Sequence, residues 1–172
     1  MKILGIDPGT ATTGWGVIDT TGDGVYDLVD FGWIKTSNVD SHEVRLTQIY
    51  NQMTAVVKKQ DPDVVAMEKL FFATNVKTAI AVGQSMGVIM LAVTQHGKTM
   101  FHYTPMQVKL VVAGSGRADK ILMKSTVRKL LKFRSPNHKK TFFDDVCDAL
   151  AVAISHARKT AEGVWNYWLS CY

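Results

Sequence analysis

The chain has 172 residues, of which 47% are hydrophobic, and a formal net charge of +5 at pH 7. This length and apolar content predict one compact domain with a full core rather than two domains. No run approaches the roughly 18 uninterrupted apolar residues of a membrane span, and the first residues lack the apolar region and cleavage site of a signal peptide, so we expect a cytoplasmic protein without a membrane segment.

Three strands joined by short turns are predicted in the first part of the chain. Apolar residues indicate strands over residues 2–6, about 14–19 and about 27–36, with "DTTGDG" as the turn between the second and the third. Three such strands form an antiparallel meander. The first strand is followed directly by Asp7. Because a buried carboxylate is costly unless something compensates it, Asp7 either caps a turn or holds a cation.

A helix and a fourth strand come next, and the strand repeats the pattern of the first. From Ser41, a candidate N-cap, to about Lys59 the apolar residues recur at helical spacing. The stretch "DPDVVAME" then indicates a buried strand after a turn that contains proline. This strand also ends in a carboxylate, Glu68.

A long helix from Asn75 to about Gln95 is rich in small and flexible apolar residues. They are Ala79, Ala81, Gly83, Ser85, Met86, Gly87, Met90 and Ala92. One face of this helix is expected to pack on the sheet. Small residues also allow two helices to approach closely, and methionine adapts to irregular partners, so we expect this helix to form a homodimer interface.

The segment from Lys98 to Lys140 concentrates positive charge. It holds eleven Lys or Arg against one acid, Asp119, whereas the rest of the chain has nine basic and fourteen acidic residues. This asymmetry suggests a face that binds a polyanion, and solvated helical lysines are an equally weighted alternative. A strand "TMFHYTP", a short helix "PMQVKLVVAG" and a turn "GSGRADK" are predicted within it, and Lys120 opens a helix that runs to about Lys132. A helix N-terminus that follows glycines favours phosphate binding. The spacing of these glycines, however, fits neither the Walker motif nor the dinucleotide-binding motif.

The last predicted helix, "FFDDVCDALAVAISHARK", follows a basic loop, "FRSPNHKKT", and begins with a third group of acids. Asp145 and Asp148 are three residues apart and share one helix face, whereas Asp144 points elsewhere unless the register differs by one residue. An acidic helix start alone indicates capping. Together with Asp7 and Glu68, however, these acids would meet at one sheet edge if the helix crosses the first strand. Oxygen ligands of this kind select Mg²⁺ or Mn²⁺.

The two cysteines give no sign of a metal site or a disulfide framework. Cys147 lies in the apolar part of the last helix and Cys171 lies next to the C-terminus, and their spacing matches no metal motif. We expect both to be reduced thiols.

Five blocks of the sequence resemble the RuvC family of Holliday junction resolvases, which has a ribonuclease H-like fold. The resemblance covers roughly residues 2–158, and the order and spacing of the blocks make it specific. "GIDPGT" alone also begins sugar kinases and actin-like ATPases, but those need a second domain for which this chain has no room. The five blocks are "LGIDPGTATTGWGV", "AMEKLFF", "GQSMGV", "PMQVKLVVAGSGRADK" and "DDVCDALAVAISH".

The fold that this resemblance implies is an α/β fold with a mixed five-stranded sheet, three antiparallel strands followed by parallel strands, flanked by helices. The nuclease domain would span residues 1–160. Residues 161–172 would form a C-terminal aromatic tail, either a docking segment or a cover for an exposed edge.

The implied function is a structure-specific endonuclease of DNA recombination and repair. It would resolve four-way junctions by symmetric, metal-dependent phosphodiester hydrolysis that leaves 5′-phosphate and 3′-hydroxyl ends. A homodimer with two-fold symmetry would present one site to each of two strands. Whether a branch-migration helicase complex presents the junction stays open. The alternatives are a related nuclease acting on flaps or hybrids, and a non-catalytic module that binds junctions.

The resemblance also assigns the catalytic acids. Asp7, Glu68, Asp145 and Asp148 fall on the four metal-binding acids of the family, with Asp7 as the bridging ligand. Two Mg²⁺ ions, for which Mn²⁺ would substitute, can activate a water and stabilise the leaving oxygen. Lys120 joins the catalytic set, because it could stabilise charge in the transition state.

Four residues are expected to contact DNA. Lys109 and Lys120 match positions that contact the phosphate backbone, Arg117 lies in the same turn, and Phe71 matches an aromatic residue that stacks on a base. Lys109 could instead be an ordinary surface lysine, and core packing is expected for one of the residues Phe71 and Phe72.

Two histidines are weighed as metal ligands. His138 lies in the basic loop and His156 lies eight residues beyond Asp148. We expect them to be a loop histidine and a helix-surface histidine rather than ligands.

Overall fold

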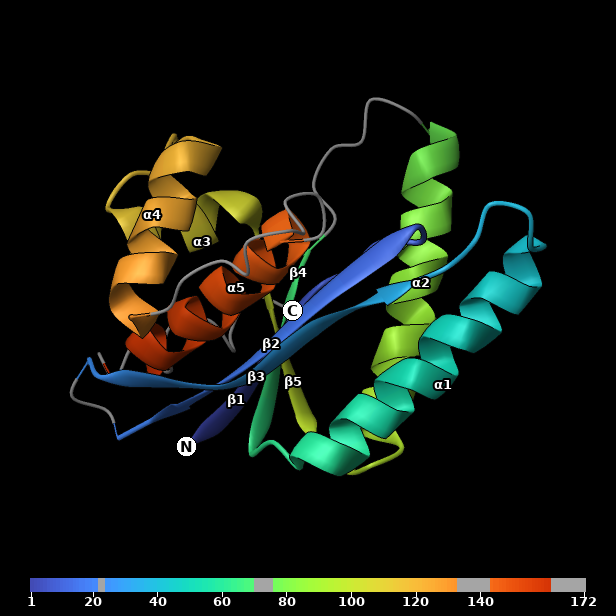
Figure 1. The fold of residues 1–172 in the computed structure, drawn as a ribbon, viewed down its shortest axis with the longest axis horizontal. Coiled ribbons are helices and arrows are strands. Elements are labelled where there is room, and N and C mark those ends of the chain that lie inside the picture. Colours follow the sequence, from blue (N-terminus) through green and yellow to red (C-terminus); the bar gives the residue numbers. More distant parts are fainter. Residues whose placement is uncertain (22–23, 70–75, 133–142, 162–172) are drawn as a thin grey trace, which may run out of the picture.

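The computed structural model describes residues 1–21, 24–69, 76–132 and 143–161, which form a five-stranded sheet with helices on both faces (Figure 1). The elements follow in the order β1 (Lys2–Asp7), β2 (Thr12–Thr20), β3 (Tyr26–Lys35), α1 (His42–Gln60), β4 (Val64–Glu68), α2 (Val76–Thr94), β5 (Thr99–Tyr103), α3 (Pro105–Ala113), α4 (Lys120–Leu131) and α5 (Phe143–Ala161).

The sheet is mixed and has the strand order β3-β2-β1-β4-β5. Strands β1, β2 and β3 pair antiparallel, which confirms the predicted meander. Strand β4 pairs parallel to β1, and β5 pairs parallel to β4. The predicted mixed sheet is therefore confirmed, and the carboxyl ends of β1, β4 and β5 meet at one edge, the place where open sheets of this kind bind ligands. We call this edge the carboxyl edge and the opposite one the amino edge.

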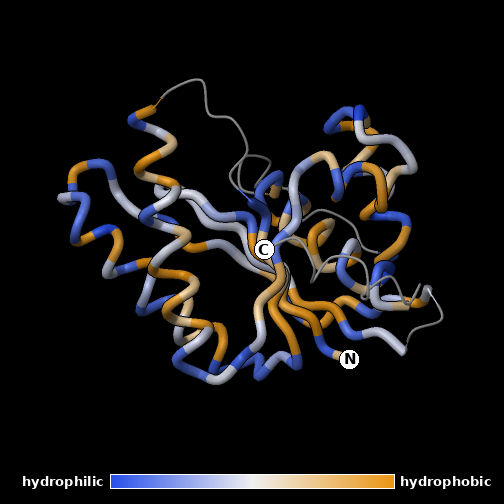
Figure 2. The backbone as a smooth tube through the Cα atoms, turned by 180° about the vertical axis from the view of Figure 1, so that it is seen from behind, coloured by the Kyte–Doolittle hydropathy of each residue, from blue (hydrophilic) through white to orange (hydrophobic). Residues whose placement is uncertain are grey.

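The helices form two layers, one on each face of the sheet. Helices α1 and α2 pack against each other on one face, whereas α5 crosses the other face and carries α3 and α4 on its outer side (Figure 1). Along β1, Leu4 and Ile6 belong to the core under α1 and α2, and Ile3 belongs to the core under α5. Strands covered on both faces are continuously apolar rather than alternating. The hydrophobic colouring of the central strands in Figure 2 follows from this burial.

The capping residues of the helices lie at or near most of the predicted helix ends. The Ser41 hydroxyl accepts a hydrogen bond from the backbone N–H of Val44 at 3.4 Å, which confirms the predicted N-cap. Helix α3 ends at Gly114, which has a φ of 75° and is the residue type that adopts this conformation most easily. The Asp119 carboxylate caps α4 by accepting from Leu122 N–H at 2.8 Å. The single acid of the basic segment therefore stabilises the start of a helix.

Helix α2 leaves a large part of its apolar surface uncovered. Val76 is 70% exposed, Ile80 57% and Leu91 48%. A methyl group added at Gly83 or Gly87 would meet no atom within 4 Å. By length and composition, α2 is the one helix within the described ranges that could cross a membrane. One buried face and one exposed apolar face together account for this composition.

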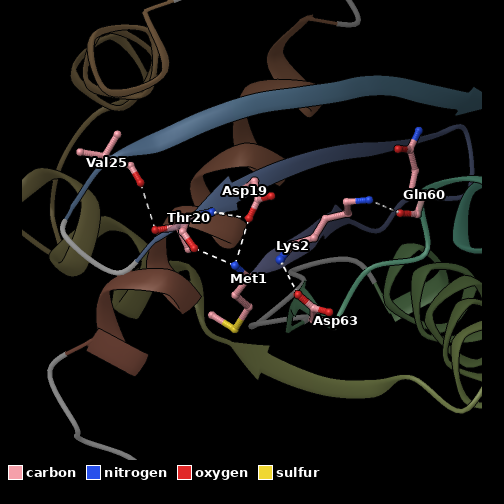
Figure 3. Close-up of polar contacts among 7 residues, drawn as sticks. All are labelled: Met1, Lys2, Asp19, Thr20, Val25, Gln60 and Asp63. Atoms are coloured by element: carbon pink, nitrogen blue, oxygen red, sulfur yellow. Dashed lines mark hydrogen bonds and ion pairs between the residues drawn. The ribbon is translucent and has the colours of Figure 1, made fainter.

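Polar contacts at the amino edge tie the start of β1 to its neighbours (Figure 3). The backbone N–H of Lys2 donates to the Asp63 carboxylate at 2.7 Å, and the Lys2 ammonium donates to the Gln60 carbonyl at 3.0 Å. The Met1 ammonium pairs with Asp19 at 3.0 Å. Carboxylates at this edge therefore have donors beside them.

Candidate active site

Two neighbouring parallel strands end in carboxylates at the carboxyl edge. Asp7 is the last residue of β1 and Glu68 the last residue of β4. The strands are in register, with Ile6 opposite Met67, so the two acids follow at adjacent positions. Both side chains are half-buried.

Helix α5 brings two more carboxylates to this edge because glycines let it lie directly on the sheet. Asp145 and Asp148 lie in the first two turns of α5. A methyl group at Gly14, which pairs with Asp7 across β1 and β2, would overlap the backbone of Asp145. A methyl group at Gly5 would overlap the Ala149 carbonyl oxygen. The absence of these side chains sets the height of the helix above the strands. We call Asp7, Glu68, Asp145 and Asp148 the carboxylate site.

The two strand carboxylates hold their protons unusually strongly. Burial is the main cause that raises the pKa of Asp7 well above its usual range, and the negative charges of Glu68, Asp148 and Asp145 raise it further. Burial, followed by the charge of Asp148, raises the pKa of Glu68 to about 7. Shared negative charge in a partly desolvated place therefore opposes ionisation of both groups.

The two helix carboxylates are shifted in the same direction. Burial raises the pKa of Asp145, with further contributions from Asp148 and Asp144. Burial is also the largest cause of the raised pKa of Asp148, which the nearby Lys120 partly opposes. All four acids of the carboxylate site thus lack enough neighbouring positive charge to offset their burial.

Asp144 faces away from the carboxylate site. Its side chain forms an ion pair with Lys124 of α4 at 2.5 Å. The charge of Asp144 still raises the pKa of Asp145. Of the two residues that the sequence left as alternatives, Asp145 is the one that influences Asp7.

The donor set of the carboxylate site fits a divalent cation. It supplies only carboxylate oxygens, the ligands of Mg²⁺ and Mn²⁺. A cation would also relieve the mutual repulsion that raises the four pKa values. Across the described ranges, no three Asp, Glu, His or Cys side chains form a preformed metal cage. Repulsion between ionised carboxylates acts against such convergence.

Two of the predicted lysines lie close enough to influence the carboxylate site. The positive charge of Lys120 lowers the pKa values of all four acids, and Lys109 does the same for Glu68 and Asp148. Arg117 is exposed in the turn between α3 and α4. Lys98, the first residue of the basic segment, instead pairs with Asp61 at the amino edge. The segment therefore divides, with only part of it near the carboxylate site.

Several predictions fall outside the described residues. These are the roles of Phe71 and Phe72, the loop position of His138, the thiol of Cys171, and residues 162–172 of the aromatic tail. Residue 161 still belongs to α5. Cys147 is a free and buried thiol, as predicted, and burial raises its pKa to about 11.

The prediction that His156 lies on the helix surface is wrong. Its side chain is fully buried, because α5 packs against β4 and α3 and because two aromatic residues of β5 lie beside the ring. Nδ1 of His156 lies 2.7 Å from the Tyr103 hydroxyl, and its ring lies 4.7 Å from that of Phe101. Burial lowers the pKa of His156 to about 4, so the imidazole is neutral at pH 7. His156 therefore belongs to the core and lies away from the four acids.

A second group of cations, which the sequence pattern does not indicate, lies beside the carboxylate site. Arg45 of α1 and Lys77 of α2 line a groove that also includes Asp145. These three residues are far apart in the sequence and share no motif. Near the groove, the one distinctive local pattern in the sequence is the threonine-rich stretch at residues 10–13, and the turn that contains it forms another wall of the groove.

A family model described as "Crossover junction endodeoxyribonuclease RuvC" matches residues 3–156. Curated relatives with the same description agree with this match. The protein from Caldicellulosiruptor saccharolyticus is 42% identical over 156 residues, which cover 91% of this chain and 92% of that protein. The protein from Chloroflexus aurantiacus is 45% identical over 170 residues, which cover 99% of this chain and all of that protein.

A solved structure matches over nearly the whole chain. It is described as the RuvC protein of Thermus thermophilus in complex with a Holliday junction substrate. The TM-score is 0.86 and the sequences are 31% identical, with 95% of this chain and 96% of that chain covered. The sheet order and the helix layers described above thus match the fold of a protein that has been solved with a Holliday junction substrate.

Proposed function

This chain belongs to the RuvC family, and we propose that it is an endonuclease that resolves Holliday junctions through its carboxylate site. The reaction is hydrolysis of a phosphodiester bond in DNA, leaving a 5′-phosphate and a 3′-hydroxyl, as part of recombination and repair. The observation that carries this proposal is the meeting of Asp7, Glu68, Asp145 and Asp148, all with raised pKa values, at one sheet edge.

We propose Mg²⁺ as the cofactor, with Mn²⁺ as a substitute and two ions per subunit. Asp7 would be shared between the ions, because it lies on the central strand and feels the charge of each of the other three acids. When bound, the ions activate a water molecule and stabilise the leaving oxygen. The four carboxylates would hold the ions.

Positive side chains would hold the DNA backbone over the carboxylate site. Lys120 and Lys109 would contact the phosphate groups next to the scissile bond, and Lys120 would also stabilise charge that develops there. Arg117 would extend this contact to the exposed turn. Phe71 is proposed to stack on a base, which would be independent of base identity.

We further propose that the enzyme works as a homodimer through α2. The exposed apolar face with Val76, Ile80 and Leu91 and the open positions at Gly83 and Gly87 support a close helix contact. A two-fold dimer presents two identical sites, which suits two cuts at symmetric positions. An Ile80→Asp variant is expected to sediment as a monomer and to lose paired cutting. A wild-type protein that stays monomeric would contradict this proposal.

We propose that junction cutting takes place in the cytoplasm. A branch-migration helicase complex can present the junctions to the enzyme. This partner would be tested by co-sedimentation on junction DNA. Junction cutting itself is expected without it.

The decisive experiment compares cutting of a mobile four-way junction with cutting of a flap, an RNA–DNA hybrid and a linear duplex. In Mg²⁺ the wild-type protein is expected to place paired nicks at symmetric positions of the junction, and Asp7→Asn is expected to place none. Preferred cutting of the flap or the hybrid would instead identify a related nuclease. Binding without cutting in Mg²⁺ and in Mn²⁺ would identify a non-catalytic binding module.

A further inference from the structure

A groove of about 580 Å³ opens beside the carboxylate site on the side of α1 and α2. Its walls are the turn between β1 and β2, Arg45 of α1, and the first turns of α2 from Lys77 to Val82. The turn and the start of α2 lie next to each other at the upper part of Figure 1. Lys109 and Lys120 belong to α3 and α4, on the opposite face of the sheet. The groove is therefore separate from the lysines that the proposed function uses.

The groove carries two positive charges and shares one acid with the carboxylate site. Arg45 and Lys77 contribute the cations. Asp145 is the one acidic residue among the described residues that line the groove. Because Asp145 also belongs to the carboxylate site, the two sites are continuous at this residue. An extended polyanion that crosses the carboxylate site can thus continue into the groove.

A chain of hydrogen bonds holds Arg45 at the groove. Its Nε donates to the Thr36 hydroxyl at 2.8 Å, and that hydroxyl donates to the Thr10 carbonyl at 2.6 Å. The Thr10 hydroxyl in turn donates to the Ala81 carbonyl of α2 at 3.0 Å. The turn, the start of α1 and the start of α2 are thereby fixed to one another. Within the described ranges, no carboxylate forms an ion pair with Arg45.

We propose that this groove binds a backbone phosphate of the DNA strand that is cut, close to the scissile phosphate. This inference rests on the proposed function. A guanidinium and an ammonium that line one groove from two helices suit a phosphate, and an arginine held at Nε can still offer its two terminal nitrogens as a fork. The contact would fix the register of the strand across the carboxylate site, from the side opposite to Lys109 and Lys120.

The first test measures how salt weakens junction binding in EDTA, where the DNA is not cut. Arg45→Ala and Lys77→Ala are each expected to weaken binding about tenfold at moderate salt and to reduce the slope of log K against log salt by about one. Lys58→Ala is the matched control, because Lys58 is an exposed cation on the same helix as Arg45 but near its other end. Lys77 is exposed, so Lys77→Ala is expected to fold and keeps the test decisive if Arg45→Ala loses stability.

The second test locates the phosphate. Uncharged methylphosphonate groups replace the phosphates of the cut strand one at a time. Wild-type protein is expected to lose affinity at several positions near the scissile bond. The double variant with Arg45→Ala and Lys77→Ala is expected to become insensitive at one of these positions and to keep the losses at the others.

Identical interference profiles for the wild-type and double-variant proteins would overturn the inference. So would variants that bind and respond to salt like Lys58→Ala while the wild-type protein cuts junctions normally. A wild-type protein that does not cut junctions in Mg²⁺ would overturn the proposed function, and the inference with it.

Discussion

The two edges of the sheet treat the same residue type in opposite ways. At the amino edge, hydrogen bonds from ammonium groups lower the pKa values of Asp19 and Asp61, whose side chains are mostly exposed. At the carboxyl edge, burial and mutual repulsion raise the pKa values of Asp7 and its three neighbours. Carboxylates that serve the fold have partners within the chain. Those of the carboxylate site are left for a partner from outside, which is the pattern expected of a functional site.

The largest effect is expected when one carboxylate is removed from the carboxyl edge and compared with one removed from the amino edge. Asp7→Asn is expected to reduce the cutting rate at least about a thousandfold, because the proposed ligand of both ions is lost, while junction binding persists through the cations. Glu68→Gln and Asp148→Asn should act in the same direction. The rate is measured by single-turnover cutting on a denaturing gel.

Asp19→Asn is the matched control at the amino edge, and its cutting rate should equal that of the wild type. In metal-free buffer near pH 8, Asp7→Asn is also expected to raise the melting temperature by about 3 °C, because a repelled charge is removed. Unchanged cutting in Asp7→Asn would rule out the proposed metal site.

The second test concerns stability and pH in the absence and presence of Mg²⁺. Glu68 has an ordinary pKa of 4.5 and a folded-state pKa of about 7, so the folded state binds protons more readily than the unfolded state. Without metal, stability should therefore fall as the pH rises from 4.5 to about 7. Saturating Mg²⁺ should restore roughly 2–3 kcal/mol near pH 8 and much less near pH 5, where protons already neutralise the site.

Denaturant unfolding at the two pH values, with Mg²⁺ or EDTA, measures this effect. The same Mg²⁺ effect at both pH values, or an undiminished effect in Asp7→Asn, would show that the ion binds elsewhere.

A smaller effect is expected from the cation that faces all four acids. Lys120→Ala should weaken junction binding by about tenfold and reduce the salt slope by about one, because one phosphate contact is lost. It should also raise the pKa values of the four acids, shifting the rise of cutting rate with pH to higher pH. Fluorescence anisotropy over a salt series measures the first effect, and a pH–rate profile measures the second. An unchanged salt slope would remove Lys120 from the phosphate contacts.

The smallest effect is predicted for the lysine that the basic segment places at the amino edge. Lys98→Ala breaks the exposed pair with Asp61, and such pairs contribute little to stability. Junction affinity, salt slope and cutting rate should all match the wild type, in contrast to Lys120→Ala. A reduced salt slope would mean that the DNA reaches the amino edge.

The strand and helix order was readable from the sequence because each element carries its own local signal. Apolar runs ended by Asp7 and Glu68 marked two buried strands, and Ser41 marked a helix start. The capping box of Thr104 and Gln107, by contrast, was missed, because Thr104 was assigned to the end of the preceding strand, "TMFHYTP".

The limits of prediction lie in contacts between distant segments. His156 was expected on the surface because its position on the helix says nothing about β5, whose Tyr103 lies beside it. The ion pair of Asp144 could not be read from the sequence either, because its partner Lys124 lies on another helix. Arg45 and Lys77 come together through the fold alone. A linear pattern can indicate a chemical group, but it cannot show which segment packs over it.

The contact between α5 and the glycines of the sheet has a consequence for engineering. A side chain at position 14 would meet the backbone of Asp145 rather than its carboxylate. A larger residue there would therefore push the start of α5 away from the sheet. A graded series of alanine, serine and valine at position 14 would lift Asp145 and Asp148 together while leaving every ligand chemically intact. Such a series is expected to lower the cutting rate in steps without replacing any of the four carboxylates.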